Sequence, residues 1–133
     1  MSTLSTANIT SKAANTPPVI KDLNGTECGQ FCRAWVNFDG TGTVAIRDNF
    51  NVSSITDNGA GDYTVNFTTA MANANYAVAI SGKQNGGSAA IPIPHYNASG
   101  VMTTTSMTFF FSESNSYGTK KDSEIVCFMA FGG

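Results

Sequence analysis

The segment formed by residues 33–71 decides the fold class, and its sequence is RAWVNFDGTGTVAIRDNFNVSSITDNGAGDYTVNFTTAM. Tyr63, Val65 and Phe67 alternate with polar residues, which is the two-residue period of a strand with one buried face. Asp-Gly, Gly-Thr-Gly and Asp-Asn-Gly sequences interrupt this alternation, and such residues favour tight turns because they tolerate positive φ. The segment therefore predicts four short antiparallel strands arranged as two hairpins.

Composition extends the β prediction to the whole chain. The 133 residues are the size of one domain and include nine phenylalanines but only two leucines, a balance that suits a sheet better than a helix. We expect an all-β fold over residues 31–133: an antiparallel β-sandwich, jelly-roll-like, of about eight strands. Residues 1–30 are predicted to form an extended N-terminal arm or linker, because Pro17-Pro18 disfavours both helix and central strand. Further strands are expected at residues 75–81, 91–94, 101–111 and 124–131, the second of them at a sheet edge because of its two prolines.

The last predicted strand, residues 124–131, is apolar on both faces. Val126 and Phe128 share one face, and Met129 lies on the other. A small sandwich has one core in which to bury such side chains, so a second apolar surface is left over. We therefore expect Val126, Phe128 or residues 109–111 to lie in an interface between subunits.

Charge argues against several functional classes. The formal net charge is -2, and the seven cations are scattered, so no basic surface for nucleic acid is predicted. No apolar run is long enough to span a membrane, and the N-terminus has no hydrophobic signal core. We expect a soluble protein without membrane insertion. Because no secretory signal is found, its Asn-x-Ser/Thr sequences are expected to reflect the Asn- and Thr-rich composition and not glycosylation.

Candidate catalytic residues are few. His95 is the only histidine, and no Gly-x-Ser-x-Gly sequence accompanies it. Glu113 and Glu124 would make a glycosidase pair only if the fold brought them together, and the other carboxylates mostly occupy turn sequences. We expect no enzymatic activity and no cofactor.

A metal site is also not expected. Cys28, Cys32, Cys127 and His95 match a zinc site in number, but their spacing does not fit one. A disulfide between Cys28 and Cys32 would require an oxidising environment. In a trimer, three copies of His95 could meet on the axis around a metal or anion; the other interpretation is a surface histidine beside an aromatic residue.

Several of these segments together resemble a known family. The matching sequences are RAWVNFDGTGTVAIR, NVSSITDNG, GDYTVNFT and ANYAV within residues 33–80, with Thr16-Pro17-Pro18 before them. They resemble the distal module of bacteriophage tail-fibre proteins, especially those of marine phages, whereas residues 81–133 lie outside the resemblance. It implies a virion protein made in the host cytoplasm, usually a homotrimer. It also implies contacts with other virion structural proteins and with a host surface glycan or outer-membrane receptor.

Two polar loops, residues 82–88 and 113–121, are the candidates for receptor binding, because recognition residues often lie in loops on a rigid scaffold. The other interpretation of these loops is as solvated hairpin tips. Two other functions are also open: a virion decoration or connector protein held by its N-terminal arm, and a lectin-like carbohydrate-binding module. Trp35 is expected in the core or in a subunit interface and not in a sugar-binding platform. The receptor-binding candidates are Lys83, Gln84, Asn85, His95, Tyr96, Tyr117, Lys120 and Lys121.

Overall fold

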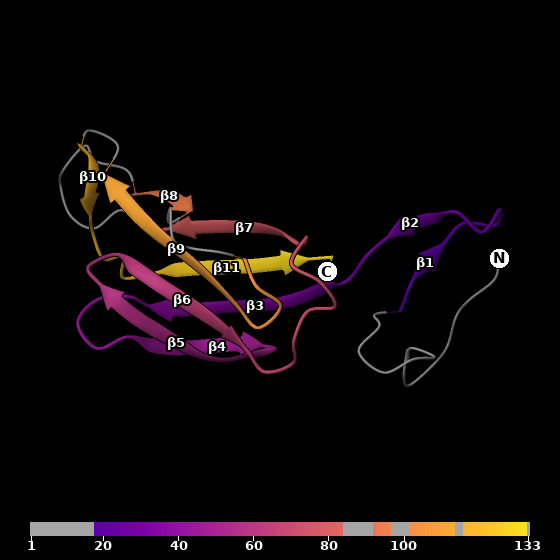
Figure 1. Ribbon diagram of the computed structural model, residues 1–133, viewed down its shortest axis with the longest axis horizontal. Coiled ribbons are helices and arrows are strands. Elements are labelled where there is room, and N and C mark those ends of the chain that lie inside the picture. The colour runs from indigo at the N-terminus through magenta and orange to yellow at the C-terminus, as the bar shows by residue number, and fades with distance from the viewer. Residues whose placement is uncertain (1–17, 84–91, 97–101, 114–115, 133) are drawn as a thin grey trace.

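The computed structural model describes residues 18–83, 92–96, 102–113 and 116–132, and this part of the chain is all-β with antiparallel sheets (Figure 1). No helix occurs in these ranges, and so none that could cross a membrane. The strands are β1 (Ile20–Lys21), β2 (Glu27–Gly29), β3 (Cys32–Asp39), β4 (Ala45–Phe50), β5 (Val52–Gly59), β6 (Asp62–Phe67), β7 (Ala77–Gly82), β8 (Pro92–Tyr96), β9 (Ser106–Glu113), β10 (Ser116–Lys120) and β11 (Val126–Phe131).

Strands β3 to β11 form two sheets that pack face to face. One sheet has the order β4-β3-β11-β7. The other has the order β10-β9-β6-β5, with β8 paired to β9 as well. The two predicted hairpins, β3-β4 and β5-β6, belong to different sheets, and the last strand lies between β3 and β7. The expected all-β sandwich is confirmed.

The core lies between the two sheets and is rich in aromatic residues. Tyr63, Val65 and Phe67 of β6 are buried as predicted. Phe109 packs against Tyr63 and Phe128, with ring centroids 6.0 and 6.2 Å apart, so β6, β9 and β11 share one aromatic cluster. These contacts join the two sheets directly, because β11 belongs to the sheet opposite β6 and β9.

The outer faces of the two sheets differ in chemistry. On the sheet that contains β6, Thr56, Thr64 and Thr108 are aligned by strand register, and we call this row the hydroxyl ladder. The Thr64 and Thr108 hydroxyl oxygens lie 2.8 Å apart. On the other sheet, register aligns one apolar residue from each strand. We call this row the apolar band; it consists of Phe50, Trp35, Met129 and Ala79.

The predicted interface residues of the last strand are not at the surface. Val126 and Phe128 are buried within the chain, as are Phe109 and Phe111, because two opposing sheets are enough to cover them. The other face of β11 is exposed instead, with Met129 40% accessible to solvent. An interface on Val126, Phe128, Phe109 or Phe111 is therefore wrong, whereas Phe110 is only half-buried.

Two segments have more regular structure than expected. Residues 18–30 include a β1-β2 hairpin and are not simply extended, because the Asp22 carboxylate accepts hydrogen bonds from the backbone of Asn24 and Thr26, and Gly25 has a φ of 82°. The second segment, residues 113–121, was expected to be a loop. It contains β10, which raises the sandwich from about eight strands to nine among the described residues.

The buried face of β6 yields a stability prediction. Phe67→Ala should lower the free energy of unfolding by about 3 to 5 kcal/mol, because the ring packs against Tyr76 and Phe128 with centroids 5.7 and 6.3 Å away. Phe31→Ala makes the same chemical change at a ring that is 40% exposed and lies outside the apolar band, so it should cost clearly less. Denaturant unfolding of both variants checks this, and equal losses would contradict the assigned core.

Candidate functional site

One end of the sandwich gathers the described lysines that were predicted to bind a receptor; we call it the loop end. It lies where β7, β8 and β10 approach one another, opposite the β1-β2 hairpin (Figure 1). Lys83 follows β7 and pairs with Glu124 at 2.6 Å, and Lys121 follows β10 and pairs with Glu113 at 2.6 Å. Both pairs are solvent-accessible, so each contributes little to stability and can exchange partners with a ligand.

A buried tyrosine fixes the geometry of this end. The Tyr63 hydroxyl lies 2.9 Å from the Gly40 carbonyl oxygen and 3.1 Å from Asp122 Oδ1. The backbone N–H of Gly61 donates to the same carboxylate oxygen at 2.6 Å. Burial and the Asp122 carboxylate raise the pKa of Tyr63 far above its usual range, so the phenol stays protonated. The end of β3, the start of β6 and the turn before β11 are thus held together around one hydroxyl group.

Glycine makes this approach possible. A Cβ at Gly40 would lie 2.3 Å from the Tyr63 hydroxyl oxygen, and a Cβ at Gly61 would lie 2.5 Å from the Lys121 carbonyl oxygen. Gly61 also has a φ of 66°, a conformation that residues with a side chain rarely adopt. Both positions therefore require glycine for packing, and Gly61 requires it for its backbone conformation as well.

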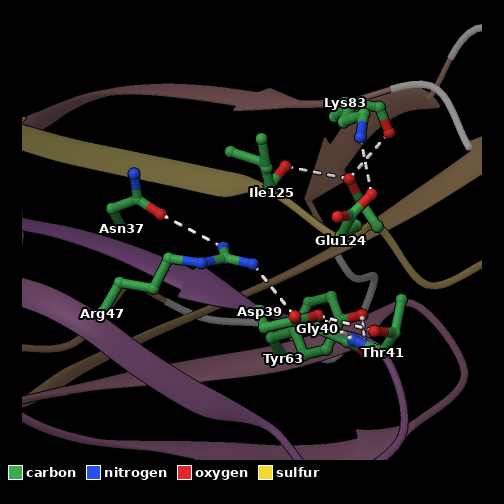
Figure 2. A network of polar contacts seen from close by, with 10 residues as sticks. Asn37, Asp39, Gly40, Thr41, Arg47, Tyr63, Lys83, Glu124 and Ile125 are labelled. Atoms are coloured by element: carbon green, nitrogen blue, oxygen red, sulfur yellow. Dashed lines mark hydrogen bonds and ion pairs between the residues drawn. The ribbon is translucent and has the colours of Figure 1, made fainter.

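The polar contacts continue onto β3, β4 and β7 (Figure 2). Asp39 accepts hydrogen bonds from the backbone and side chain of Thr41, which hold the pKa of Asp39 below its usual range, and it pairs with Arg47 at 2.9 Å. The hydroxyl of buried Ser123 donates to the Lys83 carbonyl oxygen at 2.8 Å. The backbone of the loop end is therefore anchored on both sheets.

His95 lies in a second cluster on the outer face of the sheet. Its ring stacks on Phe110 with centroids 5.1 Å apart, and Lys120 Nζ lies 5.0 Å from the same phenyl centroid. Lys120 also pairs with the carboxylate of Asp62. His95 Nε2 lies 2.7 Å from Ser112 Oγ. Because Ser112 is only 1% exposed, its hydroxyl cannot reach a bound substrate, and the contact orients the imidazole.

Tyr96 is the most exposed of the candidate side chains that the structure describes. It is 59% accessible and lies beside a cavity of about 250 Å³ between β7 and β8, whose lining includes His95 and Pro94. The cavity is smaller than typical small-molecule sites. The site therefore suits contact with the surface of a larger partner, with Tyr96 as the exposed aromatic contact.

The remaining predicted residues have different outcomes. Gln84 and Asn85 lie outside the described residues. The backbone of Tyr117 lies in β10, but its side chain is outside the description. Lys83, Lys120 and Lys121 lie at the loop end, and His95 and Tyr96 lie in the adjoining β8 strand. Trp35 is half-buried on the outer face of its sheet.

The cysteines do not come together. Cys28, Cys32 and Cys127 are free thiols, and Cys32 Sγ donates to the Ala34 carbonyl oxygen at 3.2 Å. Within the described ranges, no cluster of three or more His, Cys, Asp or Glu side chains could hold a metal ion. The carboxylates considered as a glycosidase pair, Glu113 and Glu124, are each in an ion pair with a lysine.

Sequence reasoning missed the apolar band. Its signal was the alternation of Trp35 with buried Val36, which puts the indole on the face opposite the core, but the alignment with Phe50 and Met129 depends on strand order.

No family model matches the chain, and no curated protein or solved structure was found that resembles it.

The Tyr63 contacts yield a second prediction. Tyr63→Phe should lower the free energy of unfolding by about 1 to 3 kcal/mol, because buried acceptors lose their donor. Gly40→Ala should cost more, since its Cβ would overlap the phenol. Tyr63→Phe should lower the free energy of unfolding by less in the Gly40→Ala variant than in the native protein, because it removes the hydroxyl that clashes with the new Cβ. Denaturant unfolding measures the cycle; strict additivity would show that the two residues do not interact.

Proposed function

We propose that the protein is a non-enzymatic attachment module of a phage fibre, which acts as a homotrimer on the virion and binds the host cell surface through its loop end. The observation that carries this proposal is the difference between the parts of the surface: the apolar band crosses one sheet, the hydroxyl ladder lies on the other, and exposed ion pairs gather at the loop end. Such a division suits a module that is attached on one side and recognises a partner on another.

The apolar band supports assembly. Its four residues cross the whole β4-β3-β11-β7 sheet, and Phe131, 38% exposed, lies on the same face of β11 as Met129. Exposed apolar surface is costly in water, and adjacent apolar residues on a sheet face are typical of subunit interfaces. The band itself carries no charge, so a second copy of the chain can pack on these four residues without desolvating a charged group of the band. Threefold closure follows from the family resemblance and suits a fibre.

The loop end supports recognition. Tyr96 and the ion-paired Lys83 and Lys121 are exposed there, while the Tyr63 contacts hold the backbone beneath them in place. A rigid scaffold that carries adaptable side chains lowers the entropic cost of binding. The expected partner is a glycan or a protein receptor on the host surface.

One observation favours the connector alternative. The β1-β2 hairpin stands apart from the sandwich and exposes apolar side chains, with Val19 49% and Ile20 43% accessible. An exposed apolar hairpin can dock on another virion protein. Deletion of residues 1–30 should therefore abolish incorporation of the protein into particles, while the shortened protein still binds host cells. Loss of both incorporation and host binding would favour the connector function.

The assembly proposal predicts a mass of about three times that of the chain by light scattering after size exclusion. Met129→Lys should yield monomers, because it places a charge in the apolar band. Thr56→Lys adds the same charge on the opposite outer face and should leave the trimer intact. Phe128→Lys should unfold the chain instead, since that side chain is buried in the core. A native monomer at micromolar concentration would rule out assembly through the band.

The recognition proposal predicts that Tyr96→Ala combined with Lys121→Gln lowers binding of the labelled protein to its host bacteria by about tenfold or more. Ile93→Ala is the control, because Ile93 is 40% exposed on the same strand but faces the other side of the sheet. Flow cytometry measures binding, and thermal unfolding confirms that both variants are folded. Undiminished binding by the double variant would exclude the loop end as the receptor site.

A further inference from the structure

A larger cavity lies at the opposite end of the sandwich, where the hairpin joins β3. Its volume is about 550 Å³, within the range of small-molecule sites. The start of β3, the end of β4 and the residues after β6 converge on it, and its lining includes Phe31, Arg33, Phe50, Thr68 and Thr69. The loop end and its candidate residues take no part in this cavity.

Arg33 is the unusual member of this lining. The other four described cations of the sandwich, Arg47, Lys83, Lys120 and Lys121, are all in ion pairs, whereas Arg33 makes none with any described residue. Its Nε is buried and has no hydrogen-bond acceptor in the described part of the chain. Arg33 as a whole is only partly buried and lines the cavity, so a ligand there can offer the guanidinium the charged partner that the described chain does not.

Local backbone structure holds Arg33 in this position. Ala34 and Cys32 pair with consecutive residues of β11, Ala130 and Phe131, so Arg33 is the extra residue of a β-bulge. Bulges redirect side chains and are common beside functional sites. The irregularity therefore coincides with the unpaired cation.

Asn51 fixes the cavity walls. Its side-chain amide donates to the Arg33 carbonyl oxygen at 3.0 Å and to the Thr69 carbonyl oxygen at 3.1 Å, and its Oδ1 accepts from the Thr69 N–H at 2.7 Å. Asn51 also has a φ of 56°, which is uncommon for a residue other than glycine. The bulge and the segment after β6 are thus tied together, and the cavity is preformed.

We propose that this cavity binds a carboxylate-bearing sugar, such as a uronic acid, with the carboxylate on the Arg33 guanidinium. One cation in an otherwise uncharged lining matches a single negative charge, and the planar guanidinium matches a carboxylate in geometry. The exposed ring of Phe31, which lies outside the apolar band, offers a flat apolar surface to the C–H face of a pyranose. Thr68 and Thr69 supply hydroxyl groups for those of the sugar.

The test is a titration of the full-length protein, in its native oligomeric state, followed by saturation-transfer NMR. Sodium glucuronate should bind saturably, and glucose, which lacks the carboxylate, should bind about tenfold more weakly or not at all. Arg33→Met should weaken glucuronate binding by about tenfold or more, and Arg33→Lys should restore only part of it. Arg47→Met removes a paired arginine elsewhere on the sheet and should leave binding unchanged.

Thermal unfolding separates a binding role from a structural one. Arg33→Met should be at least as stable as the native protein without ligand, because it removes a buried donor that has no acceptor. Benzoate tests whether the sugar hydroxyls contribute: binding of benzoate without glucuronate would overturn the sugar assignment. Absence of saturable glucuronate binding, or equal binding by Arg33→Met, would overturn the site itself.

Discussion

The Tyr63 hydroxyl is the contact on which the arrangement of the loop end depends. It joins the Gly40 carbonyl at the end of β3 to the Asp122 carboxylate before β11, while its ring packs edge-on against Phe38 with centroids 5.2 Å apart. A single side chain thus belongs both to the aromatic core and to the polar contacts above it. Because these groups come from both sheets, the distance between the sheets and the position of the turn before β11 are set together.

The two outer faces of the sandwich differ in chemistry, so its two sides are not equivalent. On one side the Thr64 and Thr108 hydroxyl groups pair with each other, and Thr56 accepts from the Asn66 amide. On the other side the Trp35 indole has a single N–H donor and Met129 only a weakly accepting sulfur. Partner surfaces of different chemistry are therefore expected on the two sides. The Arg33 cavity adds a third kind of surface, a charged group within an apolar lining, at the end far from the candidate receptor site.

Local sequence was sufficient for the strands of residues 33–71, because alternation and turn residues act over a few positions. It was also sufficient to find the face of β6 that is buried. The side of β11 that faces the core was not predictable, since Val126 and Met129 are both apolar and only the opposing sheet distinguishes them. β10 was missed because Gly118, with a φ of 97°, and its polar neighbours have the composition of a loop. Arg33 gave no signal, because the absence of a partner is a property of the folded chain.

The hydroxyl ladder has a consequence for the medium in which the protein works. Its contacts are made by neutral groups, so counterions do not screen them, and the Asn66 amide that donates to the Thr56 hydroxyl at 3.0 Å extends the same uncharged chemistry. The exposed ion pairs at the loop end, by contrast, weaken as ionic strength rises. High salt should therefore loosen the side chains at one end of the molecule, while the hydroxyl ladder keeps its contacts.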